Sequence, residues 1–160
     1  SGIAYLGWLG AYLVSLRALP DGMYWMLLAL PGIALADSGA FFIGRRFGRH
    51  KLAPRTSPKK TWEGYLGGVV TGGLGTMALA ALWHLNAPSL TPLQGLLLGL
   101  AVSALAPLGD LGESLLKRQF NVKDSSNLLP GHGGILDRID SWLWAAAIGY
   151  YLISWFWLAR

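Results

Sequence analysis

The sequence predicts an all-α fold, a polytopic transmembrane helical bundle made by a single domain over residues 1–160. Of these residues, 53% are hydrophobic and only 13% are charged, about half the charge of a typical soluble domain. No Lys, Arg, Asp or Glu occurs in the 46 residues from Gly64 to Gly109, or from Ser141 to Ala159. A helix crosses a bilayer with about 20 apolar residues, so charge-free runs of this length predict membrane-spanning segments.

We expect about five such segments, separated by two long polar loops and two short connections. The segments are Gly2–Leu19, Met23–Ile43, Tyr65–Leu85, Leu93–Leu116 and Ser141–Leu158. Pro31 in the second segment and Pro107 in the fourth predict an interruption near one end of each, because proline breaks the helical hydrogen-bond ladder.

The third segment is rich in glycine. Its Gly68-x-x-x-Gly72 spacing predicts the close approach of another helix. A loose resemblance to a dinucleotide-binding glycine pattern is set aside, because no strand is expected before it.

The two polar loops, Gly44–Gly64 and Lys117–Asp140, carry most of the basic residues. By the positive-inside rule both loops face the cytoplasm, and the two short connections face the other side. The chain has no cysteine, which excludes disulfides and thiolate metal sites, and no nucleic-acid partner is expected.

Acidic residues within membrane segments are costly and indicate function. In a helix Asp110, Glu113, Ser114 and Lys117 would share one face. Snorkelling at a helix end would explain Lys117, but an aspartate is too short to snorkel, so Asp110 is a candidate functional residue.

The second polar loop continues with a glycine-rich turn around His132, formed by Gly131, Gly133 and Gly134, whose backbone N–H groups could bind an anion. Asp137 and Asp140 then open the last helix, where simple capping is an alternative role. Hard oxygen ligands without cysteine suit Mg²⁺. Asp110 and Asp137, one from each helix that bounds the loop, are the predicted metal pair.

The first polar loop contains Ser57-Pro58-Lys59-Lys60-Thr61-Trp62-Glu63-Gly64. Its lysines could attract anionic lipid, or they could bind phosphates together with the adjacent hydroxyls. Composition alone does not separate these two roles.

Three motifs together resemble the phosphatidate cytidylyltransferase family. The longest is Ser114-x-Leu116-Lys117-Arg118-x₄-Lys123-Asp124-x-Ser126-x₂-Leu129-Pro130-x-His132-Gly133-Gly134-Ile135-x-Asp137-Arg138-Ile139-Asp140. The other two are the segment Ser57–Gly64 and the segment Ala36-Asp37-Ser38-Gly39-Ala40-Phe41-Phe42. The resemblance covers nearly the whole chain and corresponds to the C-terminal part of a longer enzyme.

The resemblance implies an integral membrane enzyme, usually a homodimer, in the bacterial inner membrane with its site facing the cytoplasm. It would join CTP to phosphatidic acid, giving CDP-diacylglycerol and pyrophosphate. Asp110 and Asp137 would bind Mg²⁺ and, in some members, a second cation such as K⁺.

The remaining site residues have implied roles in binding the substrates. Phosphate charge would be neutralised by the basic residues Lys59, Lys60, Lys117, Arg118, Lys123 and Arg138. Substrate contacts are expected from Ser57, Thr61, Ser114, His132, Gly133 and Gly134. Asp37 and Glu113 would orient basic residues or support the cation ligands. Alternative functions are a CTP-dependent lipid kinase, a cytidylyltransferase for ether lipids, and a transporter with acids on broken helices.

Overall fold

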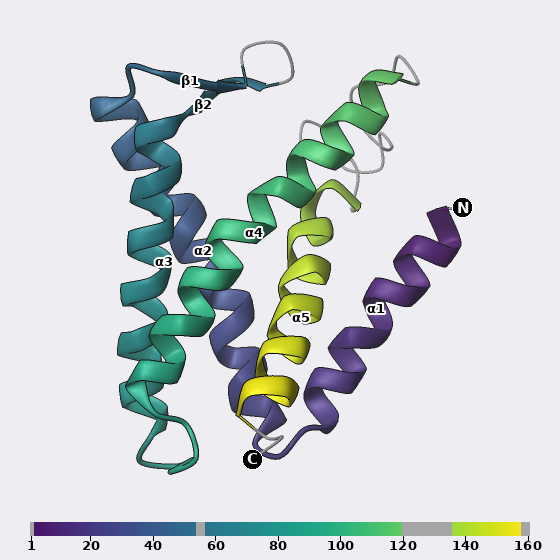
Figure 1. Ribbon diagram of the computed structural model, residues 1–160, viewed down its shortest axis with the longest axis vertical. Coiled ribbons are helices and arrows are strands. Elements are labelled where there is room, and N and C mark those ends of the chain that lie inside the picture. Colours follow the sequence, from purple (N-terminus) through teal and green to yellow (C-terminus); the bar gives the residue numbers. More distant parts are fainter. Residues whose placement is uncertain (1, 54–56, 120–135, 158–160) are drawn as a thin grey trace.

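The computed structural model describes residues 2–53, 57–119 and 136–157, which form a helical bundle with a small β-hairpin (Figure 1). The helices of this part are α1 (Gly2–Ala18), α2 (Gly22–Phe47), α3 (Trp62–Trp83), α4 (Pro92–Gln119) and α5 (Leu136–Phe156). Each predicted segment coincides with one of these helices, with differences of a few residues at the ends. The helical prediction is therefore confirmed.

The all-α prediction is wrong in one place. Within the first polar loop, β1 (Lys51–Ala53) pairs antiparallel with β2 (Ser57–Thr61), with Lys51 opposite Thr61 and Ala53 opposite Ser57. Lysine and proline are unfavourable in strands, so the local sequence of β2 gives little strand signal. The pairing arises because α2 ends and α3 begins close together, which brings the intervening chain back on itself.

The predicted interruptions of the second and fourth segments are also wrong. The helix α2 is 26 residues long and continues without a break through Pro31, and α4 is 28 residues long and continues through Pro107. A proline removes one backbone donor and is tolerated in a helix whose neighbours hold it in place.

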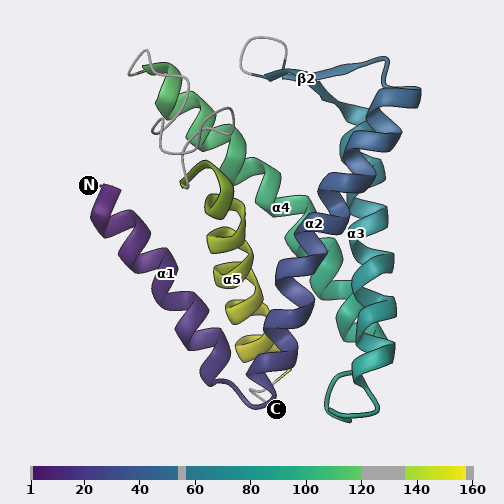
Figure 2. The same cartoon turned by 180° about the vertical axis from the view of Figure 1, so that it is seen from behind.

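Consecutive helices run in opposite directions (Figures 1 and 2). The hairpin, the end of α2, the start of α3, the end of α4 and the start of α5 all lie at one end of the bundle, here called the hairpin end. The α1–α2 and α3–α4 connections lie at the opposite end, where the Ser89 hydroxyl hydrogen-bonds the Asp21 carboxylate. The two short connections therefore share one end, as predicted.

Glycines of α3 and α4 allow α3 to pack closely on both α2 and α4. A Cβ atom added at Gly68 would lie 2.8 Å from the carbonyl oxygen of Ala36 in α2. On the α4 side, a Cβ added at Gly95 would lie 2.7 Å from the carbonyl oxygen of Thr76 in α3. The predicted helix approach at Gly68 is confirmed. A strand, β2, does precede α3, contrary to expectation, but the glycines pack within the helix instead of forming a strand–helix turn.

The hydrophobic core lies where α1, α2, α4 and α5 meet, and it includes the fully buried side chains of Leu16, Leu28, Leu98 and Ile153. Trp25 of α2 stacks on Trp157 after α5, with ring centroids 5.2 Å apart. In the described part of the chain, α2 and α3 are each long and apolar enough to cross a membrane. For all five helices, a membrane-spanning role stays a prediction.

Candidate functional site

A cavity of about 370 Å³ lies between α2, α3, α4 and the hairpin, toward the hairpin end. It is lined by Asp37 from the motif in α2 and by Lys60 and Thr61 from the motif in β2. Two of the three sequence motifs therefore meet at one cavity, through Asp37 and Lys60, which are 23 positions apart in the chain. The third motif begins within α4, which contributes Ser103 to the lining.

The inner lining is made mainly of small residues, including Ala36, Ala40 and Gly68. These small residues let α2 and α3 pack closely at the inner end of the cavity. Tyr65 of α3 closes the side toward α4, because its hydroxyl donates a 2.8 Å hydrogen bond to the carbonyl oxygen of Ala104. The cavity walls are therefore formed by three packed helices together with the hairpin.

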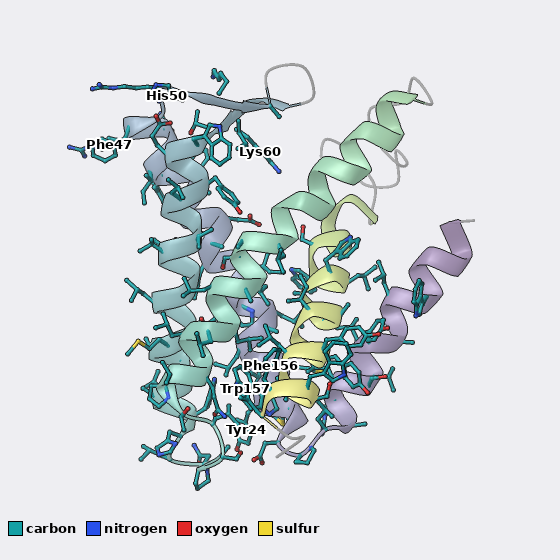
Figure 3. All side chains as sticks on the ribbon, in the orientation of Figure 1. Tyr24, Phe47, His50, Lys60, Phe156 and Trp157 are labelled. Atoms are coloured by element: carbon teal, nitrogen blue, oxygen red, sulfur yellow. The ribbon has the colours of Figure 1, made fainter. Side chains whose placement is uncertain are left out.

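The outer part of the cavity is cationic. Among the described residues that line the cavity, Arg45 at the end of α2 and Lys60 on β2 are basic, and Asp37 is the one acid. Figure 3 shows Lys60 extending from the hairpin toward α4. The two basic residues lie toward the hairpin, and small apolar residues line the inner end. This arrangement suits a ligand with an anionic group and an apolar or neutral remainder.

Thr61 has a structural role in this arrangement. It is buried at the N-cap of α3, where its Oγ1 accepts a hydrogen bond from the Gly64 backbone N–H at 3.2 Å. N-cap threonines of this kind satisfy a donor that the helix leaves unpaired. Thr61 thus caps the start of α3, and it also lines the cavity next to Lys60.

Glu63 anchors the hairpin to the end of α2. Its carboxylate accepts hydrogen bonds from the backbone N–H of Arg49 at 3.1 Å and of His50 at 3.2 Å. It also contacts the His50 Nδ1 at 2.6 Å, at the outer edge of the hairpin end (Figure 3). One carboxylate therefore holds the chain entering β1 against the first turn of α3.

Replacing Glu63 by Gln is expected to loosen this anchor, because an amide has one acceptor oxygen and no charge. Hydrogen–deuterium exchange at the Arg49 and His50 amides should become several-fold faster. Peptides covering the α3–α4 connection, at the other end of the bundle, serve as the internal reference. Unchanged exchange at Arg49 and His50 would show that the hairpin is held by other contacts.

Some of the other predicted residues lie on described helices or on β2, and others lie outside the described residues. The α4 residues Asp110, Glu113, Ser114, Lys117 and Arg118 lie in its last ten positions, and Asp137 and Arg138 are the second and third residues of α5. These helix ends lie at the hairpin end (Figure 1). Ser57 and Lys59 lie on β2. Lys123, His132, Gly133 and Gly134 fall outside the described residues. The metal pair of Asp110 and Asp137 stays a prediction.

Sequence reasoning missed three residues that line the cavity: Arg45, Tyr65 and Ser103. For Ser103 a signal was present, since it is a polar residue in a charge-free run and precedes Asp110 by seven positions. That spacing is about two helical turns. Arg45 was hidden among other basic residues of its loop, and Tyr65 had no distinguishing pattern.

Comparison with known proteins gives consistent matches. A sequence model described as Cytidylyltransferase family matches residues 1–156. The phosphatidate cytidylyltransferase of Bacillus subtilis is 43% identical over 154 residues, covering 95% of this chain and 56% of the relative. That of Haemophilus influenzae is 46% identical over 125 residues, covering 75% and 42%. That of Synechocystis is 45% identical over 134 residues, covering 84% and 44%.

The chain thus spans about half the length of these curated relatives. The family match extends over nearly all of it and includes every element that lines the cavity. The chain belongs to the cytidylyltransferase family.

Proposed function

We propose that this chain forms the membrane-embedded catalytic part of an enzyme that transfers CMP from CTP to phosphatidic acid. The observation that carries the proposal is that Asp37, Lys60 and Thr61 line one cavity. These residues come from two of the three sequence motifs. The relatives named above are phosphatidate cytidylyltransferases, and they are 43–46% identical over most of this chain. The products would be CDP-diacylglycerol and pyrophosphate.

In this reaction an oxygen of the lipid phosphate forms a bond to the α-phosphorus of CTP. The bond from that phosphorus to the β-phosphate oxygen breaks, and pyrophosphate leaves. Phosphate oxygens are already ionised near neutral pH, so the step needs alignment and charge neutralisation more than a strong base. The cationic outer part of the cavity, with Lys60 and Arg45, supplies such a surface for the lipid phosphate.

The residues proposed for Mg²⁺ are Asp110 and Asp137. Their helix ends lie at the hairpin end, the same end as the cationic part of the cavity, and carboxylates are the ligands that Mg²⁺ takes together with substrate phosphates. When bound, the metal would polarise the phosphorus and offset charge on the nucleotide phosphates. A second cation such as K⁺ would bind nearby.

Charge neutralisation of CTP would fall to the basic residues around these ends. They are Lys59, Lys117, Arg118, Lys123 and Arg138. Substrate contacts would come from Ser57, Ser114, His132, Gly133 and Gly134. Asp37 and Glu113 would orient basic residues.

All five helices are proposed to lie in the membrane, with the hairpin end facing the cytoplasm. The described basic residues of this end include Arg45, Arg46, Arg49 and Lys51, which the positive-inside rule places on the cytoplasmic side. The exposed apolar face of α3, with Leu66, Val70 and Leu74, would contact lipid or the second subunit of a homodimer.

The test is a transfer assay with the full-length protein in mixed micelles, α-³²P-labelled CTP, Mg²⁺ and phosphatidic acid. We expect label to appear in an organic-phase lipid and to be lost on chelation with EDTA, because the metal is required for charge neutralisation. The control repeats the assay with γ-labelled CTP, from which a cytidylyltransferase transfers no label to lipid. Lipid labelled only from γ-labelled CTP would indicate a lipid kinase and overturn the proposal.

A further inference from the structure

Tyr65 connects the start of α3 to the middle of α4. Its hydroxyl donates a hydrogen bond of 2.8 Å to the carbonyl oxygen of Ala104, and its ring packs edge-on against Trp62 with centroids 5.9 Å apart. A partly buried tyrosine hydroxyl usually finds such a partner, so the bond alone would be an ordinary packing contact. What distinguishes this bond is the position of Ala104 within α4.

Ala104 lies in the turn of α4 that precedes Pro107. Because proline has no backbone N–H, the carbonyl oxygen of Ser103, four positions earlier, lacks the donor that a helix normally supplies. A proline ring in a helix also crowds that carbonyl, which weakens the turn. Ala104 follows directly, and its carbonyl oxygen has two lone pairs, so it can accept the Tyr65 hydroxyl in addition to a bond from its own helix. Tyr65 therefore braces α4 at the turn that Pro107 weakens.

The two parts of α4 on either side of this turn have different surroundings. In the part before it, small residues bring α4 against α3, with Gly95 beside Ala80 and Ser103 beside Gly72. Toward the hairpin end, α4 leans away from α3 and lies beside the start of α5 (Figures 1 and 2). Tyr65 thus holds α4 near the point where the two helices diverge.

The diverging part of α4 carries one of the acids proposed to bind Mg²⁺. Asp110 follows Pro107 by three residues, which is less than one helical turn. A tilt of α4 at the proline would therefore displace Asp110, while the residues before the proline would stay packed on α3. Mg²⁺ requires nearly ideal octahedral geometry, so a small displacement of one ligand weakens its binding.

We propose that Tyr65 is a positioning residue, whose hydrogen bond to Ala104 braces the proline turn of α4 and thereby fixes Asp110 relative to the cavity. Tyr65 itself lines the cavity, so one side chain connects the cavity wall to the part of α4 that carries this acid. The inference rests on the proposed function where it concerns Mg²⁺. The brace itself is a property of the fold and can be measured without metal or substrate.

The experiment uses the full-length protein in detergent and compares the wild type with Tyr65→Phe, which removes the hydroxyl and keeps the ring. Tyr12→Phe is the matched control, since the Tyr12 and Tyr151 hydroxyls are hydrogen-bonded at 2.6 Å between α1 and α5. Hydrogen–deuterium exchange is measured along α4 without metal or substrate. In Tyr65→Phe the amides of residues 108–112 should exchange about fivefold faster, the effect of one hydrogen bond of ordinary net strength. The amides of residues 96–102 should keep their wild-type rates, as should all of α4 in Tyr12→Phe.

A second substitution tests the part played by the proline. Pro107→Ala restores a backbone donor for the Ser103 carbonyl oxygen, so α4 should no longer need the brace. In the double variant Tyr65→Phe, Pro107→Ala, exchange at residues 108–112 should therefore return to the wild-type rate. Exchange as fast as in Tyr65→Phe alone, or faster exchange along the whole of α4, would show that Tyr65 only packs α3 on α4 and would overturn the inference.

Transfer assays then measure the connection to Mg²⁺. In Tyr65→Phe the Mg²⁺ concentration that gives the half-maximal rate should rise about fivefold, while the rate at saturating Mg²⁺ and the KM for phosphatidic acid stay within about twofold of wild type. An unchanged Mg²⁺ requirement with a raised KM for phosphatidic acid would mean that the hydroxyl contacts the lipid, and it would overturn the inference. An inactive wild type would refute the proposed function, and the exchange pattern would then decide whether Tyr65 braces α4.

Discussion

Replacing Asp137 by Asn is expected to lower CMP transfer by roughly 10³-fold or more, while the protein stays folded in detergent. The residue lies at the start of α5, at the hairpin end of the bundle. A metal ion contributes several kcal/mol of charge stabilisation in phosphoryl transfer, and each 1.4 kcal/mol corresponds to a factor of ten in rate. An amide oxygen is a much weaker ligand for Mg²⁺ than a carboxylate. Initial rates at saturating CTP and phosphatidic acid measure the effect.

The same loss is expected for Asp110→Asn, because the two acids are proposed to hold one metal site. Asp21→Asn is the matched control, since Asp21 lies at the opposite end of the bundle, where it is bonded to Ser89. A conservative Asp137→Glu variant should recover part of the rate at raised Mg²⁺ concentration. Near-normal activity of Asp137→Asn would remove this residue from the metal site.

Replacing Gly68 by Leu is expected to destabilise the bundle by about 3 kcal/mol, toward the upper end of the usual range for overpacked cores. The new Cβ would lie 2.8 Å from the Ala36 carbonyl oxygen and 2.9 Å from the Ala40 Cβ. The first of these is a backbone atom, so α2 and α3 would have to separate along their contact. The unfolding temperature in detergent should fall by roughly 10 °C.

Gly10→Leu provides the control for this substitution. Gly10 lies in α1, and a Cβ added there meets nothing within 4 Å. Leucine is also a better helix former than glycine, so the unfolding temperature of this variant should not fall. If Gly68→Leu unfolded at the wild-type temperature, the close approach of α2 and α3 would not be a feature of the folded protein.

Much of the helical architecture could be predicted because it depends on local composition. Charge-free runs define the helices within a few residues at their ends, and the Gly68-x-x-x-Gly72 spacing predicts the close approach of another helix to α3. The hairpin could not be predicted in this way. Its strand β2 has an unfavourable composition. Contacts made elsewhere hold the hairpin, because Glu63 binds the chain just before β1 and Thr61 caps α3 at the end of β2.

The candidate site was likewise predictable in its residues but not in their arrangement. Asp37, Lys60 and Thr61 could be identified one by one, since a charge or hydroxyl in an apolar chain is conspicuous in the sequence itself. That these residues line one cavity could not, because their distance apart depends on how α2, α3 and the hairpin pack. Ser103 gave a sequence signal as a polar residue in a charge-free run, but its place in the cavity wall depends on how α4 packs on α2 and α3.

By itself, therefore, the sequence determined the helical segments, the polar loops between them, and the residue types able to bind phosphate and metal. These follow from the cost of placing charge and unpaired backbone in an apolar environment, which each segment meets on its own. Only the tertiary structure decided that two motifs share a cavity and which residue of α4 lines it. Such properties depend on contacts between segments far apart in the chain, which no single segment contains.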